Sequence, residues 1–161
     1  TEAWAKSFVS NFVRKPQGND RAQIMAVANG IADLAIANSY YYGYMLSGKA
    51  GDAQRDAAKK VKMFFPNQTN RGMHINISGL GVLKSSKNVD NANKFIEFLL
   101  SNQMQSSMVN NSFEYPILKN VLPHPDIASS GVEFIEDDML VSEFGKFNAE
   151  AIKLMDRAGW K

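Results

Sequence analysis

The chain has 161 residues, 45% hydrophobic content, a formal net charge of +2 and no cysteine. This length suits one domain with a sizeable core, and the lack of cysteine excludes a disulfide framework, a thiolate zinc site and a cysteine nucleophile. The mild positive charge is spread along the chain, whereas nucleic-acid binding favours clustered lysine and arginine, so the composition argues against a nucleic-acid partner. No apolar run has the length of a membrane-spanning helix.

The first elements predict two helices and then a buried strand. Trp4, Phe8 and Phe12 lie four residues apart, which predicts a helix that runs to about Val13. Because this pattern is present from the start, without an initiator methionine or a signal segment, we expect a chain that begins partway through a domain. A second helix is predicted over 20–28, and the apolar run 31–37 predicts a buried strand that turns into a helix.

Three consecutive tyrosines, Tyr40, Tyr41 and Tyr42, follow that predicted strand. A buried phenol needs a hydrogen-bond partner, so three in a row cannot all be core residues. Where a strand turns into a helix, two neighbouring rings can face one cleft, and ligands of α/β sheets usually bind there. Phenolate is a hard donor that forms at neutral pH for a strong Lewis acid such as ferric iron. The alternative is an aromatic lid or a wall on which a sugar stacks.

Helices and short extended stretches alternate over the rest of the chain, which predicts an α/β fold. Further helices are expected up to about residue 46, from about residue 52, and over 90–100, 102–109 and 142–157. Further strands are expected over 62–65, 73–83 and 112–118. We expect the last helix to pack on the lobe that holds the tyrosines.

Other residues with metal-binding chemistry favour structural roles. His74 lies on a predicted strand whose polar positions alternate with isoleucines, and His124 lies in a loop between two prolines. Met104 and Met108 are typical of soft packing, and the acidic residues in 133–138 are typical of a solvated face. No phosphate loop, nucleophile elbow or paired-histidine motif is present, so the sequence predicts no enzyme.

Several blocks of the sequence resemble the ferric-iron-binding periplasmic proteins of bacterial ABC transporters. The tyrosine pair after Asn38 and Ser39 is the most specific element, while the other blocks also suit related solute-binding proteins. The blocks occur in the order found in that family, over residues 16–30, 36–43, 64–67, 72–79 and 148–161.

This resemblance implies a periplasmic-binding-protein-like fold of type II, which has two lobes. The chain would supply part of the C-terminal lobe in 1–71, a hinge strand and a returning segment of the N-terminal lobe in 72–122, and closing helices of the C-terminal lobe in 123–161. The remaining N-terminal lobe and a third tyrosine ligand would lie upstream of Thr1.

The resemblance also implies the roles of individual residues. Tyr40 and Tyr41 would ligate Fe(III), and Tyr42 would support them. Asn38 would contact a synergistic anion, either phosphate or carbonate. Asp20 and Arg21 lie in the region of a second residue that contacts the anion, beside a helix N-terminus that offers free amides.

The implied function is capture of Fe(III) in the periplasm, or by a protein anchored by lipid outside the cytoplasmic membrane, and delivery to an ABC permease in the inner membrane. Because two tyrosines do not complete an octahedral ferric shell, we expect weak or absent iron binding without the missing lobe. Two alternatives remain. The same fold could carry an anion, thiamine or a polyamine, or a metal-dependent enzyme could use Tyr40 or Tyr41 as a base near the acidic residues of 133–138.

Overall fold

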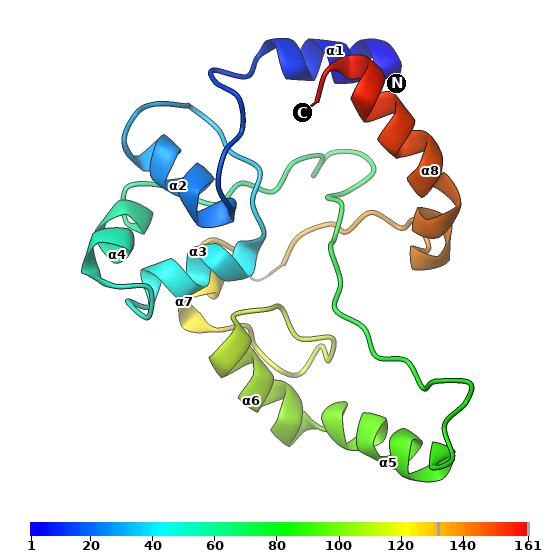
Figure 1. Ribbon diagram of the computed structural model, residues 1–161. Coiled ribbons are helices and arrows are strands. Elements are labelled where there is room, and N and C mark those ends of the chain that lie inside the picture. Colours follow the sequence, from blue (N-terminus) through cyan, green and yellow to red (C-terminus); the bar gives the residue numbers. More distant parts are fainter. Residues whose placement is uncertain (132, 161) are drawn as a thin grey trace.

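The computed structural model describes residues 1–131 and 133–160, and within them the chain forms eight α-helices (Figure 1). Val132 and Lys161, the last residue of the final resembling block, lie outside the described residues. No described helix is long and apolar enough to cross a membrane. The helices are α1 (Glu2–Ser10), α2 (Asp20–Ala28), α3 (Ser39–Leu46), α4 (Asp52–Ala58), α5 (Val89–Leu99), α6 (Asn102–Ser112), α7 (Pro125–Ala128) and α8 (Val141–Ala158).

Local signals set the bounds of several helices. The side chain of Asn19 caps α2 by accepting a hydrogen bond from the amide of Ala22 at 3.2 Å, and Ser101 caps α6 in the same way. Helix α8 ends at Gly159, whose φ of 81° suits glycine. Helix α1 ends at Ser10 and not near Val13, because the side chains of Ser10 and Asn11 donate to the carbonyl of Ser7 and compete with the next helical turn.

The buried core lies among α2, α3, α4 and α7. Met45 of α3, Phe113 after α6 and Ile127 of α7 are fully buried there. Gly43 allows α3 and α7 to approach closely, because a Cβ atom at this position would lie 2.7 Å from Cδ1 of Ile127. This core holds the helix that carries the tyrosines.

Two helices at the ends of the chain form a separate contact. Helix α8 packs on α1, at the top of Figure 1, and not on the tyrosine helix α3. The ring of Phe8 stacks against Trp4 at 5.3 Å and against Trp160 at 5.2 Å, and Arg157 pairs with Glu2 at 2.9 Å. Helix α1, on which α8 packs, lies in segment 1–71, which we assigned to the lobe that holds the tyrosines.

The predicted strands do not form ladders in the described residues, where the one β contact is an isolated parallel bridge between Met73 and Glu136. Segment 31–37 was predicted to be buried, yet Leu34 is 82% exposed. A strand is stabilised by pairing with a neighbour, and apart from this single bridge at the first residue of 73–83 none of the four stretches has a described strand partner. In the fourth stretch, the amide of Ile117 donates to the buried side chain of Gln105 at 3.2 Å and not to another strand.

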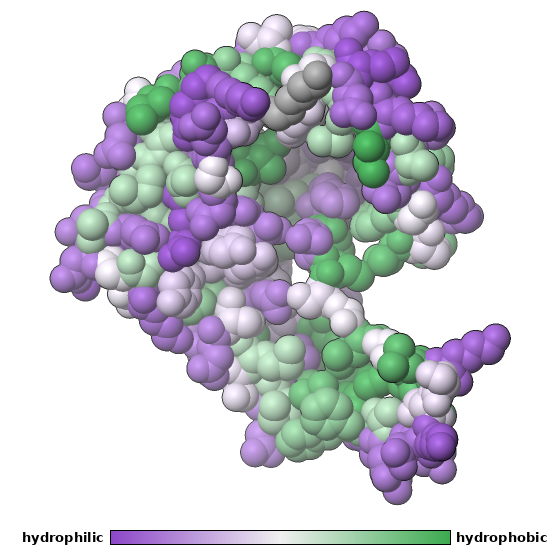
Figure 2. Space-filling model, viewed as in Figure 1, coloured by the Kyte–Doolittle hydropathy of each residue, from purple (hydrophilic) through white to green (hydrophobic). Residues whose placement is uncertain are grey.

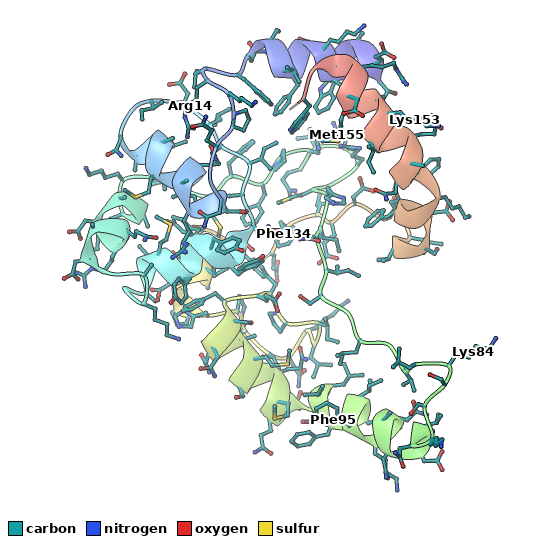
Figure 3. The ribbon with its side chains drawn as sticks, in the orientation of Figure 1. Arg14, Lys84, Phe95, Phe134, Lys153 and Met155 are labelled. Carbon is teal, nitrogen blue, oxygen red and sulfur yellow. The ribbon has the colours of Figure 1, made fainter. Side chains whose placement is uncertain are left out.

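The residues around the acidic segment 133–138 are tied to a distant part of the chain. Gln68 exchanges two hydrogen bonds with the backbone of Ile135, at 2.7 and 3.1 Å. Phe134, near the centre of the molecule in Figure 3, stacks on Phe65 with ring centroids 4.7 Å apart. Most of the acidic side chains in this segment are exposed, and no described group of three or more acidic or histidine residues could hold a metal.

Helices α5 and α6 form an arm at the lower end of the molecule. Hydrophobic surface gathers there in Figure 2, and Phe95, labelled in Figure 3, is 58% exposed. Helix α5 has no buried residue. In α6 the buried positions are Gln105 and Val109; of the two methionines expected to pack, Met104 is half-buried and Met108 is exposed.

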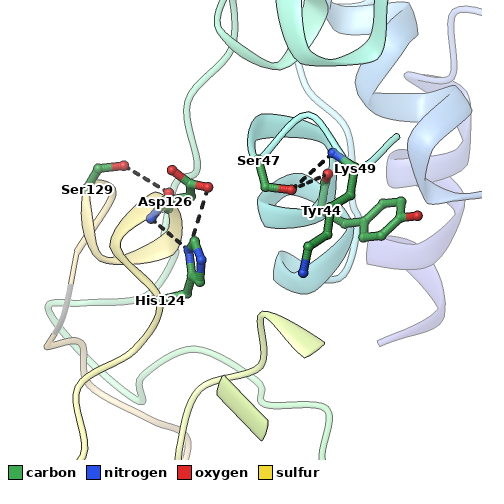
Figure 4. A network of polar contacts seen from close by, with 6 residues as sticks. All are labelled: Tyr44, Ser47, Lys49, His124, Asp126 and Ser129. Atoms are coloured by element: carbon green, nitrogen blue, oxygen red, sulfur yellow. Dashed lines mark hydrogen bonds and ion pairs between the residues drawn. The ribbon is translucent and has the colours of Figure 1, made fainter. Parts of the chain in front are cut away.

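His124 is the last loop residue before the short helix α7, as the sequence predicted, and it occupies the N-cap position of that helix. Its Nδ1 atom accepts a hydrogen bond from the amide of Asp126 at 3.2 Å and so caps α7 (Figure 4). Pro125 at the first helical position has no amide hydrogen to satisfy, which favours a helix start. The histidine ring also packs on Phe113 at 4.6 Å.

Candidate functional site

Tyr40 and Tyr41 lie in the first turn of α3 and share one depression on the surface. Their ring centroids are 4.4 Å apart and the rings are inclined by 42°. The depression has a volume of about 280 Å³ and is lined by Tyr40, Tyr41, Arg21, Tyr44 and Ser112. Both hydroxyl groups can therefore approach one small ligand.

Tyr42 occupies a different environment from its two neighbours. Successive residues of a helix point about 100° apart, and Tyr42 points into the core, where its hydroxyl donates to the carbonyl of Val61 at 3.2 Å. Burial raises the pKa of Tyr42. Its position holds α3 on the core and places its ring outside the depression.

The electrostatic surroundings keep Tyr40 protonated in the absence of a cation. Its pKa is raised to about 12, chiefly because hydrogen bonding with the hydroxyl of Tyr41 stabilises the protonated form of Tyr40, and then because of desolvation and the negative charges of Asp20 and Glu114. A strong Lewis acid can displace such a proton, and the same two carboxylates attract a cation. The depression therefore combines protonated phenols with a field that favours positive charge.

Asn38 connects the tyrosine helix to α2. Its backbone amide donates to Oδ1 of Asp20 at 2.7 Å, and its side-chain amide donates to the same oxygen at 3.1 Å. Its side-chain carbonyl accepts a hydrogen bond from Asn76 at 2.9 Å. The structure thus brings Asn38 and Asp20 together beside the tyrosines, and the backbone amide and one side-chain N–H of Asn38 are bonded to Asp20.

Arg21 supplies the positive charge in the wall of the depression. Its guanidinium carbon lies 6.0 Å from the ring centroid of Tyr44, a loose cation–π contact. Arg21 and Asp20 are neighbours at the start of α2, yet only Arg21 lines the depression. A positive side chain is thereby available to an anionic group bound beside the tyrosines.

Sequence reasoning missed several residues around this depression. Tyr44 could have been found, because it lies four residues after Tyr40 and so on the same face of the helix. Ser112, Glu114 and Asn76 carry no such signal, because they approach the tyrosines only through the fold. The acidic residues in 133–138 are absent from the residues that line the depression.

Comparison with known proteins connects this geometry to iron. The chain is 50% identical over all its residues to Iron uptake protein A1 of Synechocystis and covers 44% of that protein. The solved structure of Trichodesmium IdiA (FutA) in complex with iron and citrate matches 99% of the chain with a TM-score of 0.93 and 49% identity. A ferric binding protein from Campylobacter jejuni matches 99% of the chain with a TM-score of 0.89 and 38% identity.

The chain spans about half the length of these relatives: it covers 50% of each of the two solved chains. These relatives have the two-lobed fold of type II periplasmic binding proteins, so the fold class expected from the sequence is confirmed. The stretches without strand partners are consistent with half of such a fold. Residues 3–132 match the family described as bacterial extracellular solute-binding protein, which is not a family of enzymes. The chain belongs to this family of bacterial extracellular solute-binding proteins.

Proposed function

We propose that this chain is the tyrosine-bearing half of a ferric-iron-binding protein, in which the phenolates of Tyr40 and Tyr41 ligate Fe(III). The observation that carries the proposal is the shared depression, in which the two rings lie 4.4 Å apart beside the charges of Asp20 and Glu114. The relatives that are named for iron uptake or ferric binding support the same ion.

Binding in this proposal exchanges protons for the metal. Each phenol that ligates iron loses its hydrogen, and the raised pKa of Tyr40 delays this loss until the ion arrives. Two phenolates leave most of an octahedral shell open, so the remaining ligands come from the other half of the two-lobed protein. Closure of the lobes over the ion is selected because the closed form binds it more tightly.

The lobe assignment belongs to the same proposal. Segments 1–71 and 123–161 form the tyrosine-bearing lobe, and 72–122 contains the hinge strand and a returning segment of the other lobe. The burial of Phe113 against α3 supports a return of the chain to the tyrosine-bearing lobe by that residue. The arm of α5 and α6 then belongs to the returning segment.

A synergistic anion, phosphate or carbonate, would contact Arg21 in this arrangement. Two of the three N–H groups of Asn38 are bonded to Asp20, and the carboxylate of Asp20 repels an anion. Arg21 lines the depression with a positive charge. The protein would then deliver iron from the periplasm, or from a lipid-anchored position outside the membrane, to an ABC permease.

The test is a titration with ferric citrate, followed by the visible charge-transfer band between tyrosinate and iron. In the protein that contains both lobes, Tyr40→Phe and Tyr41→Phe should each reduce or abolish the band, whereas Tyr115→Phe, whose hydroxyl donates to the carbonyl of Gly131, should leave it unchanged. This chain by itself should give a weak band or none. Full binding by the Tyr40→Phe, Tyr41→Phe double variant would refute the proposal.

A cationic organic solute such as a polyamine or thiamine is the second candidate. Three tyrosine rings with two carboxylate charges nearby are suited to hold a cation by cation–π contact. An anion is the third member of this non-metal group, and Arg21 would be its contact. Native mass spectrometry of the purified protein separates these ligands from iron by mass, and a bound organic molecule without iron would favour this second candidate.

A further inference from the structure

The extended segment 73–79 places two polar side chains beside the tyrosine depression. The side-chain amide of Asn76 donates to Oδ1 of Asn38 at 2.9 Å, and the hydroxyl of Ser78 donates to Oε1 of Glu114 at 2.6 Å. Residues two apart on an extended chain point to the same side. The alternating polar residues Asn76 and Ser78 therefore contact residues that surround Tyr40.

Asn38 occupies the N-cap position of α3 but does not cap the helix with its side chain. Asparagine at this position commonly accepts a hydrogen bond from the second or third amide of the helix, which here belong to Tyr40 and Tyr41. The amide of Tyr41 bonds to the backbone carbonyl of Asn38 at 3.2 Å, and that of Tyr40 has no partner among the described residues. The carbonyl that could cap the helix is bonded to Asn76 instead.

We propose that Asn76 is a positioning residue for the iron ligands. It holds the side chain of Asn38 between α2 and segment 73–79, in contact with Asp20, and so fixes the start of α3 with both tyrosines facing the depression. Without this bond, the side chain of Asn38 turns to cap α3 and gives up its own hydrogen bond to Asp20, while the backbone amide of Asn38 stays bonded to Asp20. The inference rests on the proposed function for the role of the tyrosines, but the choice between the two states of Asn38 exists without iron.

The rest of segment 73–79 explains why its position matters. The amide of Met73 donates to the carbonyl of Ile135, and the amide of Asp137 donates to the carbonyl of Met73, both at 2.8 Å. The ring of His74 lies 5.1 Å from that of Phe144 in α8. The segment thus joins α8 to the tyrosine depression, and a displacement of the segment would act on Tyr40 through Asn76.

The experiment compares Asn76→Ala, Asn38→Ala and the double variant in the full-length protein that carries this sequence. Asn93→Ala is the matched control, because Asn93 is exposed on α5 away from the depression. Hydrogen exchange of the Tyr40 amide is measured without iron, and ferric affinity is measured by competition with citrate. In Asn76→Ala the exchange of the Tyr40 amide should slow, because Asn38 now caps it. Affinity should fall about fivefold, the equivalent of about 1 kcal/mol for one hydrogen bond.

The double variant should bind iron as Asn38→Ala does, because Asn76 acts through Asn38. Unchanged exchange of the Tyr40 amide in Asn76→Ala would overturn the inference, and so would a further fivefold loss when Asn76→Ala is added to Asn38→Ala. If the unaltered protein binds no ferric iron, the proposed function fails, and the exchange measurement still decides the role of Asn76.

Discussion

Apolar side chains are buried around the tyrosine helix α3 but exposed on α5, the outer helix of the arm. Around α3, the side chains of Met45, Phe113 and Ile127 are fully buried. On α5, Phe95 is 58% exposed and Phe98 is 50% exposed, although their spacing is amphipathic. The candidate ligands therefore stand on the part of the chain that builds its own core.

This difference bears on how the proposed site would work. Ligands held on a rigid element keep their geometry when other parts of a protein move. Helix α3 is fixed by contacts with α2, α4 and α7. Among the helices, α5 packs mainly against α6, the other helix of the arm. Under the proposed lobe assignment, the arm changes its neighbours when the lobes close. The tyrosine pair keeps the same neighbours on the core of its own lobe.

The largest expected effect comes from removing a core side chain. Phe113→Ala should lower the free energy of unfolding by about 3–5 kcal/mol, because it leaves a cavity against Met45 and Ile127. The matched change on the arm, Phe95→Ala, should cost less than about 1 kcal/mol, because little of its area is lost from water. Urea unfolding measures both, and equal losses would contradict the contrast between core and arm.

The second effect concerns the charge of the ligands. Iron binding requires loss of the phenolic protons, and the pKa of Tyr40 is about 12, so affinity should rise with pH across the neutral range. If two phenols each release one proton, each unit of decrease in pH weakens binding by up to about 100-fold. Competition titrations with citrate at several pH values, corrected for the protonation of citrate and hydrolysis of iron, measure this slope.

The Tyr40→Phe variant is the control for this slope. With one phenol left at the site, the dependence should fall to about tenfold per pH unit. Phe95→Ala on the arm should keep the dependence of the unaltered protein. Identical slopes with and without Tyr40 would show that its phenol does not lose a proton on binding.

A third effect tests the close approach of α3 and α7. Gly43→Ala should destabilise the protein by about 1–3 kcal/mol, because the added Cβ would lie 2.7 Å from Cδ1 of Ile127 and 3.0 Å from Cβ of Phe113. Gly145→Ala in α8 meets no atom within 4 Å and should stabilise the helix by up to about 1 kcal/mol. Opposite signs in thermal unfolding would confirm the prediction, and a stabilising Gly43→Ala would refute it.

Helix positions were predictable from the sequence because their signals are local. The helix over 20–28 was predicted with the bounds that α2 has. Its two signals are next to it in the sequence: Asn19 caps its start, and Gly30 follows shortly after its end. The strands were not predictable in this way, because a strand depends on a neighbour that can lie anywhere in the chain or outside it. Segment 31–37 has the composition of a buried strand and no described partner.

The residues of the candidate site also fall into two groups, those that a local sequence pattern indicates and those that it does not. The shared face of Tyr40 and Tyr41 followed from their position at a helix start, and the spacing of Tyr44 carried the same information. Glu114 and Asn76 lie 74 and 36 residues from Tyr40 along the chain, so no local pattern could have indicated them. Ligation of iron by the two tyrosines stays a prediction.

The smallest effect compares the caps of two helices. Asn19 accepts a hydrogen bond from the amide of Ala22 at the start of α2, whereas Asn88, at the same position before α5, makes no side-chain cap. Asn19→Ala should therefore cost about 1 kcal/mol of unfolding free energy, and Asn88→Ala clearly less. Because both changes remove the same side chain from an N-cap position, a difference in urea unfolding isolates the capping bond. Equal costs would show that the start of the tyrosine-bearing core is held no better than the start of the arm.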